Sequence, residues 1–168
     1  MSESKIRMAP LAEHPSLLEE LAALQQAQWQ YLNPQYGLEQ RIEFLRCSCE
    51  QEHLPSTWIA LGPDESLLGA AMLVAHDMRD RPDLSPWLAS VIVKPEFRRQ
   101  GIASALIEWV EQAAWSQGVS QLYLYTDQQA GFYARRGWSI VESCDYSGVA
   151  VTIMAKPAPV GHTRESAC

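Results

Sequence analysis

No apolar run in this 168-residue sequence approaches the ~20 residues that cross a bilayer, so no membrane-spanning helix and no membrane partner are expected. The first ten residues lack the apolar core of a secretory signal. The cysteines, Cys47, Cys49, Cys144 and Cys168, have neither zinc-type spacing nor a matching Cys/His pair, so no metal site is expected. These absences predict a cytoplasmic protein with reduced thiols.

Basic residues are also scarce, because 13 Lys and Arg stand against 20 Asp and Glu, which gives a net charge of −7. Proteins that bind nucleic acid normally carry a basic face, so nucleic acid is not an expected partner. An acidic surface suits a cationic partner such as an amine. The composition, 47% apolar and 20% charged, is that of a folded chain, and its length fits one domain.

Hydrophobic periodicity and turn residues predict the secondary structure. The predicted strands cover residues 6–9, 57–61, 67–75, 87–93, 122–125, 138–146 and 149–154. The predicted helices cover residues 17–30, behind a capping box formed by Ser16 and Glu19, 38 to about 50, 102–117 and 127–136. The order β-α-α-β-β-β-α-β-α-β-β predicts an α/β (α+β) domain over residues 1–156, with a mixed sheet of six to seven strands and about four helices. Residues 157–168 are expected to be a disordered tail.

The first motif with chemical meaning, residues 98–103, follows the apolar strand end and has the form R-x-x-G-x-A. Gly101 permits close approach of the backbone to a ligand, and Ala103 leaves the helix end unblocked. Successive N–H groups of residues 99–104 can then surround a pyrophosphate, with added charge from Arg98 and Arg99. A structural turn with two solvated arginines is the alternative that the motif alone leaves open.

The second motif, residues 132–138, places Tyr133 on a short helix just before a glycine and a strand. A phenol is a feasible general acid for a leaving group of similar pKa, such as a thiolate. The alternative is that Phe132 and Tyr133 are core aromatics at a helix–sheet contact, and for Phe132 this alternative is preferred.

Together, in this order and at this separation, the two motifs resemble the GNAT superfamily of N-acetyltransferases, from Ile6 to about Lys156. The resemblance implies the GNAT fold, with acetyl-coenzyme A held in a V-shaped opening between two neighbouring parallel strands, residues 87–93 and 122–125. It implies that the backbone of Val91 and Val93 holds the acetyl carbonyl and the pantetheine arm, and that Tyr133 lies beside the coenzyme sulfur. The implied coenzyme-binding residues are Val91, Ile92, Val93, Arg98, Arg99, Gln100, Gly101, Ile102, Ala103, Ser104, Thr126, Asp127, Phe132, Tyr133 and Arg136.

The chain departs from the family pattern in two places. Where many members have an Asn that contacts the pantetheine, this sequence has Thr126 or Asp127. Where many members have a basic Glu on the fourth or fifth strand, this sequence offers Ser90, Tyr123 and Tyr125 but no carboxylate. We therefore expect direct attack by a neutral primary amine in a ternary complex, with the amine deprotonated through ordered water that Ser90 or Tyr125 relays.

The amine acceptor is less defined by the sequence. Its expected wall consists of Trp29, Tyr31, Tyr36, Asp77 and Trp87, although the three aromatics of residues 29–36 could instead pack on the core. Asp77 and its neighbours Asp80 and Asp83 favour a small cationic amine or an antibiotic-like amine, whereas Arg41 could read an acidic peptide N-terminus. A non-catalytic acetyl-coenzyme A sensor and an interaction module are the alternatives to an enzyme. The last strands would allow a homodimer.

Overall fold

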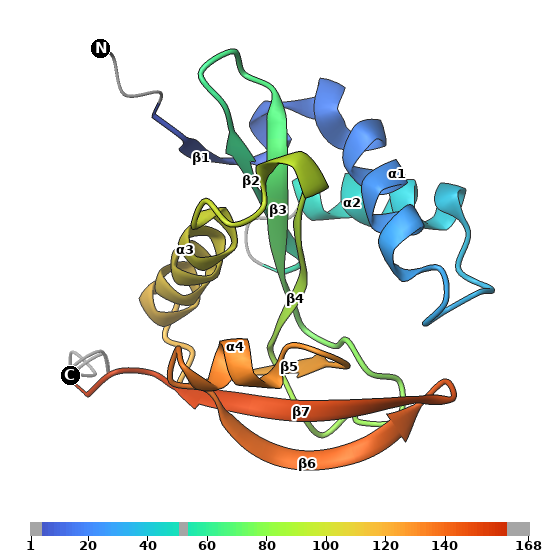
Figure 1. Ribbon diagram of the computed structural model, residues 1–168, viewed down its shortest axis with the longest axis vertical. Helices are drawn as coiled ribbons and strands as arrows, with labels where there is room; N and C mark the ends of the chain where they lie inside the picture. Colours follow the sequence, from blue (N-terminus) through green and yellow to red (C-terminus); the bar gives the residue numbers. More distant parts are fainter. Residues whose placement is uncertain (1–4, 51–53, 161–168) are drawn as a thin grey trace.

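The computed structural model describes residues 5–50 and 54–160, which form a seven-stranded sheet between two helical layers (Figure 1). The strands are β1 (Arg7–Pro10), β2 (Ser56–Leu61), β3 (Leu67–Val74), β4 (Trp87–Val93), β5 (Gln121–Thr126), β6 (Ser139–Tyr146) and β7 (Val149–Pro157). The α-helices are α1 (Leu18–Trp29), α2 (Leu38–Glu50), α3 (Ile102–Ser116) and α4 (Ala130–Ala134). Three short 3-10 helices, η1 (Leu11–Glu13), η2 (Pro15–Leu17) and η3 (Pro95–Phe97), complete the described elements.

The sheet order is β1-β2-β3-β4-β5-β7-β6, and only the β4–β5 pair is parallel. The predicted order of elements and the mixed sheet are thus confirmed. The two parallel strands are joined through α3, as a parallel connection requires a crossover. The opening between two parallel strands, which the family resemblance implies, can therefore lie only between β4 and β5.

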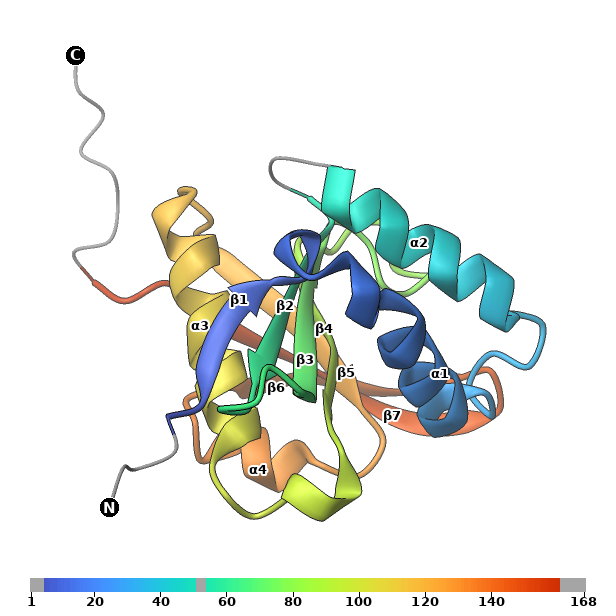
Figure 2. The ribbon, with the colours of Figure 1, turned by 90° about the horizontal axis from the view of Figure 1, so that it is seen from above.

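The two faces of the sheet have separate cores because side chains alternate along each strand. On β3, which is buried along its whole length, Ala70 and Met72 face α1 and α2, while Ala71 and Leu73 face α3. Figure 2 shows α1 and α2 on one side of the sheet, with α3 and α4 on the other. Burial on both faces explains why β3 reads as an apolar run rather than as alternation.

Three predictions of local structure are corrected. Ser16 does not cap α1, because residues 15–17 form η2 and the N-cap residue is Leu17, with no side-chain cap bond. The predicted helix at 127–136 is shorter, since Thr126 Oγ1 accepts the N–H of Gln129 at 3.0 Å and α4 begins only at Ala130. The last strand extends to Pro157, beyond its predicted end at residue 154, and the N–H of Ala158 donates to Ser120 O at 2.9 Å. Residues 161–168 of the predicted tail lie outside the described residues.

None of the helices in residues 5–50 and 54–160 has the length and apolar character that a membrane-spanning helix needs. Within the same residues, no group of three or more His, Cys, Asp or Glu side chains is arranged to hold a metal ion.

Candidate functional site

The sheet divides where β4 and β5 separate. Their parallel register contains the single pair Trp87↔Tyr123, beside which the N–H of Tyr123 donates to Pro86 O at 3.1 Å. Beyond this pair β4 continues along β3, whereas β5 remains with β7, and Figure 1 shows the two strands diverging. The C-terminal half of β4 therefore has no strand on its β5 side.

A β-bulge shapes this unpaired half of β4. The register with β3 shifts between Ala70↔Ile92 and Met72↔Ala89, so Ser90 and Val91 both lie opposite Ala71. Ser90 has a φ of +53°, a conformation uncommon for a non-glycine residue, which re-aims the strand at this point. The predicted relay residue Ser90 thus lies at the place where β4 and β5 have separated.

The backbone of Val93 points away from β3. The N–H of Lys94 donates to Leu68 O of β3 at 2.9 Å, so by alternation the polar groups of Val93 point away from β3. Arg98 does not extend outward but folds back, and its Nε donates to Val93 O at 3.1 Å. One acceptor position of Val93 is therefore already used within the protein.

The turn before α3 presents unpaired backbone donors. Arg99 and Gly101 both adopt left-handed conformations, with φ of +65° and +79°. The first backbone hydrogen bond of the helix after these residues runs from Ala105 N–H to Gly101 O. No side chain caps the N-terminus of α3. A Cβ on Gly101 would meet no atom within 4 Å, so the space over the turn is open. This arrangement suits an anionic group such as a pyrophosphate.

Arg136 connects α4 to the first turn of α3. Its Nη2 and Nε donate to Ser104 Oγ at 2.6 and 3.1 Å, and its Nη1 donates to Phe132 O at 2.9 Å. The guanidinium also stacks over the Phe132 ring, 3.6 Å from the centroid. The predicted coenzyme residues Ser104, Phe132 and Arg136 are therefore brought together, although they come from two helices.

Tyr133 lies on the α3 side of the sheet. Its ring contacts Phe132 and Trp138, with centroids 5.3 and 6.1 Å away. Burial raises the pKa of its phenol to about 12, against an opposing effect of the Arg136 guanidinium. The hydroxyl has no hydrogen-bond partner among residues 5–50 and 54–160 and is not sealed from solvent space. It is therefore a protonated donor with a free hydrogen at neutral pH.

A second group of side chains, which we call the acceptor-side cluster, lies on the α1–α2 side of the sheet. Its centre is Tyr125, whose ring packs against Tyr146 at 5.5 Å. Burial, followed by the charge of Asp77 and the phenols of Tyr146 and Tyr31, raises the pKa of Tyr125 above its usual range, while Arg41 acts in the opposite direction. The cluster therefore consists of Tyr125, Tyr146, Tyr31, Asp77 and Arg41.

Two ionisable members of this cluster lack counter-ions. Burial raises the pKa of Asp77 to about 7, and its carboxylate has no hydrogen-bond or ion-pair partner among the described residues. Arg41 is 9% exposed, and its Nε donates to Gln26 Oε1 at 3.1 Å. Its guanidinium lies 5.1 Å from the Tyr36 ring centroid but near no carboxylate in the described chain, and burial lowers its pKa.

The other predicted acceptor residues differ in position. Trp87 is fully buried and its Nε1–H donates to Leu84 O at 2.8 Å, so it supports Tyr125 from within the core instead of forming a wall, which corrects the prediction. Tyr31 is exposed, and its hydroxyl donates to Asp127 Oδ2 at 2.7 Å. Trp29 is half-buried against the α1–α2 core, and Tyr36 is half-buried beneath Arg41.

Thr126 and Asp127, which stand where the family resemblance implies an Asn, are both engaged within the protein. Thr126 holds the N–H of Gln129, and Asp127 holds Tyr31. Sequence reasoning missed Tyr146 as part of the cluster and considered Arg41 only as a reader of an acidic peptide. Nothing in the local sequence indicates a role for Tyr146. Arg41, in contrast, is a single arginine between Leu38 and Ile42 on an amphipathic helix, and this position could have indicated a buried charge.

Replacing Asp77 with Asn should stabilise the fold at neutral and higher pH. The pKa rises from 3.8 to about 7 on folding, so the folded state binds a proton between these values that the unfolded state has lost, and stability falls across this window. The gain in unfolding free energy should be absent near pH 4, grow towards pH 7 and then stay constant at about 1–2 kcal/mol. This value is smaller than the full pKa shift would give, because the carboxylate keeps some contact with water. Urea denaturation from pH 4 to 8 measures it, and Asp80→Asn, which replaces an exposed aspartate of the same loop, is the control.

Comparison with known proteins identifies the family. The family model described as Acetyltransferase (GNAT) family matches residues 18–138, and the chain belongs to this family. Solved structures share the fold, among them an aminoglycoside 6'-N-acetyltransferase complexed with coenzyme A, with 17% identity, a TM-score of 0.72, and coverage of 91% of this chain and 97% of that one.

Two further structures also resemble this chain. PaiA N-acetyltransferase from Thermoplasma acidophilum, in complex with coenzyme A, has 20% identity and a TM-score of 0.66, and 91% and 99% of the two chains are covered. Spermidine/spermine N-acetyltransferase SpeG from Vibrio cholerae has 14% identity and a TM-score of 0.67, with 92% and 93% covered. A search of curated protein sequences found no significant match.

Proposed function

We propose that this protein is an N-acetyltransferase that moves the acetyl group of acetyl-coenzyme A to a primary amine by direct attack in a ternary complex. The observation that carries the proposal is the separation of β4 from β5 after Trp87↔Tyr123, which leaves the C-terminal half of β4 without a strand on its β5 side, ahead of the uncapped N-terminus of α3. Similar structures with coenzyme A bound support the choice of donor. The acceptors named for two similar structures, an aminoglycoside and spermidine/spermine, support an amine as the acceptor class.

The two faces of the opening are suited to different halves of the reaction. The α3 side, with residues 99–104, Phe132, Tyr133 and Arg136, would hold the coenzyme, and the acceptor-side cluster would hold the amine. When bound, acetyl-coenzyme A supplies the acetyl thioester that the amine attacks. Tyr133 gives its proton to the departing sulfur. Asp77, with a pKa of about 7, accepts the proton that the ammonium form of the amine loses.

In this proposal Asp77 takes the place of bulk solvent as the final acceptor of the proton that Ser90 or Tyr125 was expected to relay through ordered water. Neither β4 nor β5 offers a carboxylate, but the loop after β3 does, and the charge of Asp77 acts directly on the Tyr125 hydroxyl. The raised pKa of Tyr125 keeps this phenol neutral, so it can pass a proton by donating and accepting but cannot act as a phenolate base. Alignment of the two bound reactants supplies much of the acceleration.

Two glycines allow a matched test of the donor site. Gly101 before α3 and Gly118 after it both have positive φ, +79° and +86°, and a Cβ on either would meet no atom within 4 Å. Replacing each with Val should cost about 1–2 kcal/mol of unfolding free energy, because a side chain disfavours this conformation. Gly101→Val alone should weaken coenzyme A binding, by at least tenfold in calorimetry, since it covers the donors of the turn.

The activity itself is tested by measuring release of coenzyme A from acetyl-coenzyme A with a panel of primary amines. Binding of coenzyme A without release by any amine would favour a sensor over an enzyme. Absence of coenzyme binding would favour an interaction module. Equal loss of affinity in the Gly101→Val and Gly118→Val variants would remove the α3 turn from the proposed site.

A further inference from the structure

We infer that the acceptor is a small molecule that carries a carboxylate as well as its primary amine, with the carboxylate bound by Arg41 and the ammonium by Asp77. The inference rests on the proposed acetyltransferase function and specifies its acceptor. It is carried by two oppositely charged side chains, the buried Arg41 and the half-buried Asp77, which have no ion-pair partner among residues 5–50 and 54–160.

Arg41 is placed as an anion receptor. It is 9% exposed, yet no Asp or Glu of the described chain pairs with it. Its Nε donates to Gln26 and its guanidinium lies over the Tyr36 ring, and these two contacts hold the guanidinium in place. Nη1 and Nη2 have no acceptor among residues 5–50 and 54–160. Within these residues, Trp138 Nε1 is the only side-chain nitrogen or oxygen that is both buried from solvent and without a hydrogen-bond partner. Both Nη groups of Arg41, which also lack a partner, are therefore accessible to solvent. Two free donors on a rigid planar fork match a carboxylate.

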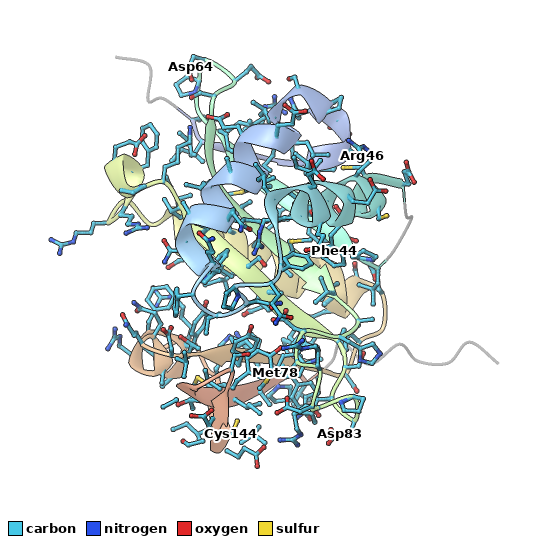
Figure 3. The ribbon with its side chains drawn as sticks, turned by 90° about the vertical axis from the view of Figure 1, so that its right-hand side faces the viewer. Phe44, Arg46, Asp64, Met78, Asp83 and Cys144 are labelled. Atoms are coloured by element: carbon cyan, nitrogen blue, oxygen red, sulfur yellow. The ribbon has the colours of Figure 1, made fainter. Side chains whose placement is uncertain are left out.

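Asp77 provides the complementary charge. Its neighbour Met78 is 1% exposed and packs in the same core as Leu45 of α2 and Tyr146 of β6, which fixes the loop after β3 against the cluster (Figure 3). In the same loop, Asp83 is held by Arg81, which also pairs with Glu142 of β6. Asp77 has no such partner, although it lies among enough protein atoms to disfavour its charge. An ammonium group would compensate this carboxylate.

The charges of Asp77 and Arg41 do not pair with each other. Both act on the Tyr125 phenol, Asp77 raising and Arg41 lowering its pKa. A purely cationic acceptor such as a polyamine would bring further positive charge towards the buried guanidinium. An acceptor with both charges compensates both side chains at once, which favours an amino carboxylate.

The surroundings of the cluster favour a small acceptor. The hydroxyl of Tyr31, in the connector between α1 and α2, donates to Asp127 Oδ2, which follows β5. This contact joins segments 96 residues apart on either side of the cluster, and the Tyr31 phenol acts on Tyr125 as well. A free amino acid requires less rearrangement of this contact than a peptide chain does.

The test compares free amino acids, phenylalanine and leucine among them, with their amides and with the corresponding amines that lack the carboxyl group. Release of coenzyme A is followed with the full chain. We expect kcat/KM for the amino acid to exceed that for its amide at least tenfold, even though the less basic amine of the amide favours the amide. In Arg41→Gln this ratio should fall to about 1, while Arg41→Lys should keep part of it. A dipeptide amide with aspartate in second position tests whether a peptide can supply the carboxylate.

Arg46→Gln is the matched control, because Arg46 lies on the same helix with an exposed side chain that pairs with Glu43 (Figure 3). It should leave the ratio unchanged. Amides or simple amines that react as well as amino acids would overturn the inference while leaving the proposed function in place. A reaction with the aspartyl dipeptide amide alone would overturn the small acceptor. Failure of every amine to release coenzyme A would remove the inference together with the function on which it rests.

Discussion

Replacing Tyr133 with Phe should lower turnover by a factor of about 10² to 10⁴, which is the usual contribution of a positioned general acid. The phenol has a free hydrogen, its pKa is about 12, and it lies on the α3 side of the sheet beside Phe132. The variant keeps the ring, and therefore its contacts with Phe132 and Trp138. Affinity for coenzyme A should change less than threefold, because the hydroxyl makes no bond that holds the donor site in shape.

Steady-state turnover and calorimetry on the same preparations measure this effect. Tyr123→Phe is a control, because it removes a phenol from the neighbouring strand β5 and should leave turnover unchanged. Turnover that survives in Tyr133→Phe would exclude Tyr133 as the proton donor. An equal fall of turnover and coenzyme affinity would show that Tyr133 acts by positioning.

Replacing Lys156 with Met should lower the free energy of unfolding by about 3 kcal/mol, because it leaves a buried carboxylate without a partner. Glu111, on α3, is 5% exposed, and its two carboxylate oxygens accept hydrogen bonds from Lys156 Nζ at 2.7 and 3.1 Å. The same ammonium donates to Arg136 O at 2.9 Å, so β7, α3 and the end of α4 meet at this one group. The loss should be visible as a lower midpoint in urea denaturation.

Lys94→Met provides a matched control, since Lys94 pairs with Glu20 at 2.6 Å but 46% of the Glu20 side chain is exposed. Its cost should be below about 1 kcal/mol, as for most surface ion pairs. In the double variant Glu111→Leu/Lys156→Met most of the loss should be recovered, because no charge remains buried. A loss as small as that of Lys94→Met would mean that water reaches the Glu111 carboxylate.

Much of the fold was predictable because its signals are local. The repeat of Ile102, Leu106 and Val110 marks the buried face of α3, and all three residues lie in the core against the sheet. The bounds of β4 were predicted as the structure has them, since a run of apolar residues, interrupted only by Ser90, extends from a proline to a lysine-proline pair. The start of α4 was missed because the Thr126 hydroxyl competes with the helix for the N–H of Gln129.

The site was predictable in part for the same reason. The turn at residues 98–103 is contiguous, so its glycine and arginines could be identified together, although the sequence did not reveal that Arg98 folds back onto Val93 O. The bulge at Ser90 and Val91 depends on the partner strand and has no local signal. The burial of Trp87 was not predicted, since an aromatic residue at a strand start can face either a core or a ligand.

The sequence by itself determined the order of elements, the mixed sheet and the motif before α3, because each depends on residues that are neighbours along the chain. Tertiary structure alone decided that Tyr146 packs against Tyr125 and that the charges of Asp77 and Arg41 act on Tyr125, since these residues come from a loop, a helix and two strands. It also decided the charge state of Asp77, because burial in the folded chain raises the pKa of this carboxyl to about 7. The residues of an anion-binding turn can be read from the sequence, whereas the environment that sets the charge of a lone carboxylate exists only after folding.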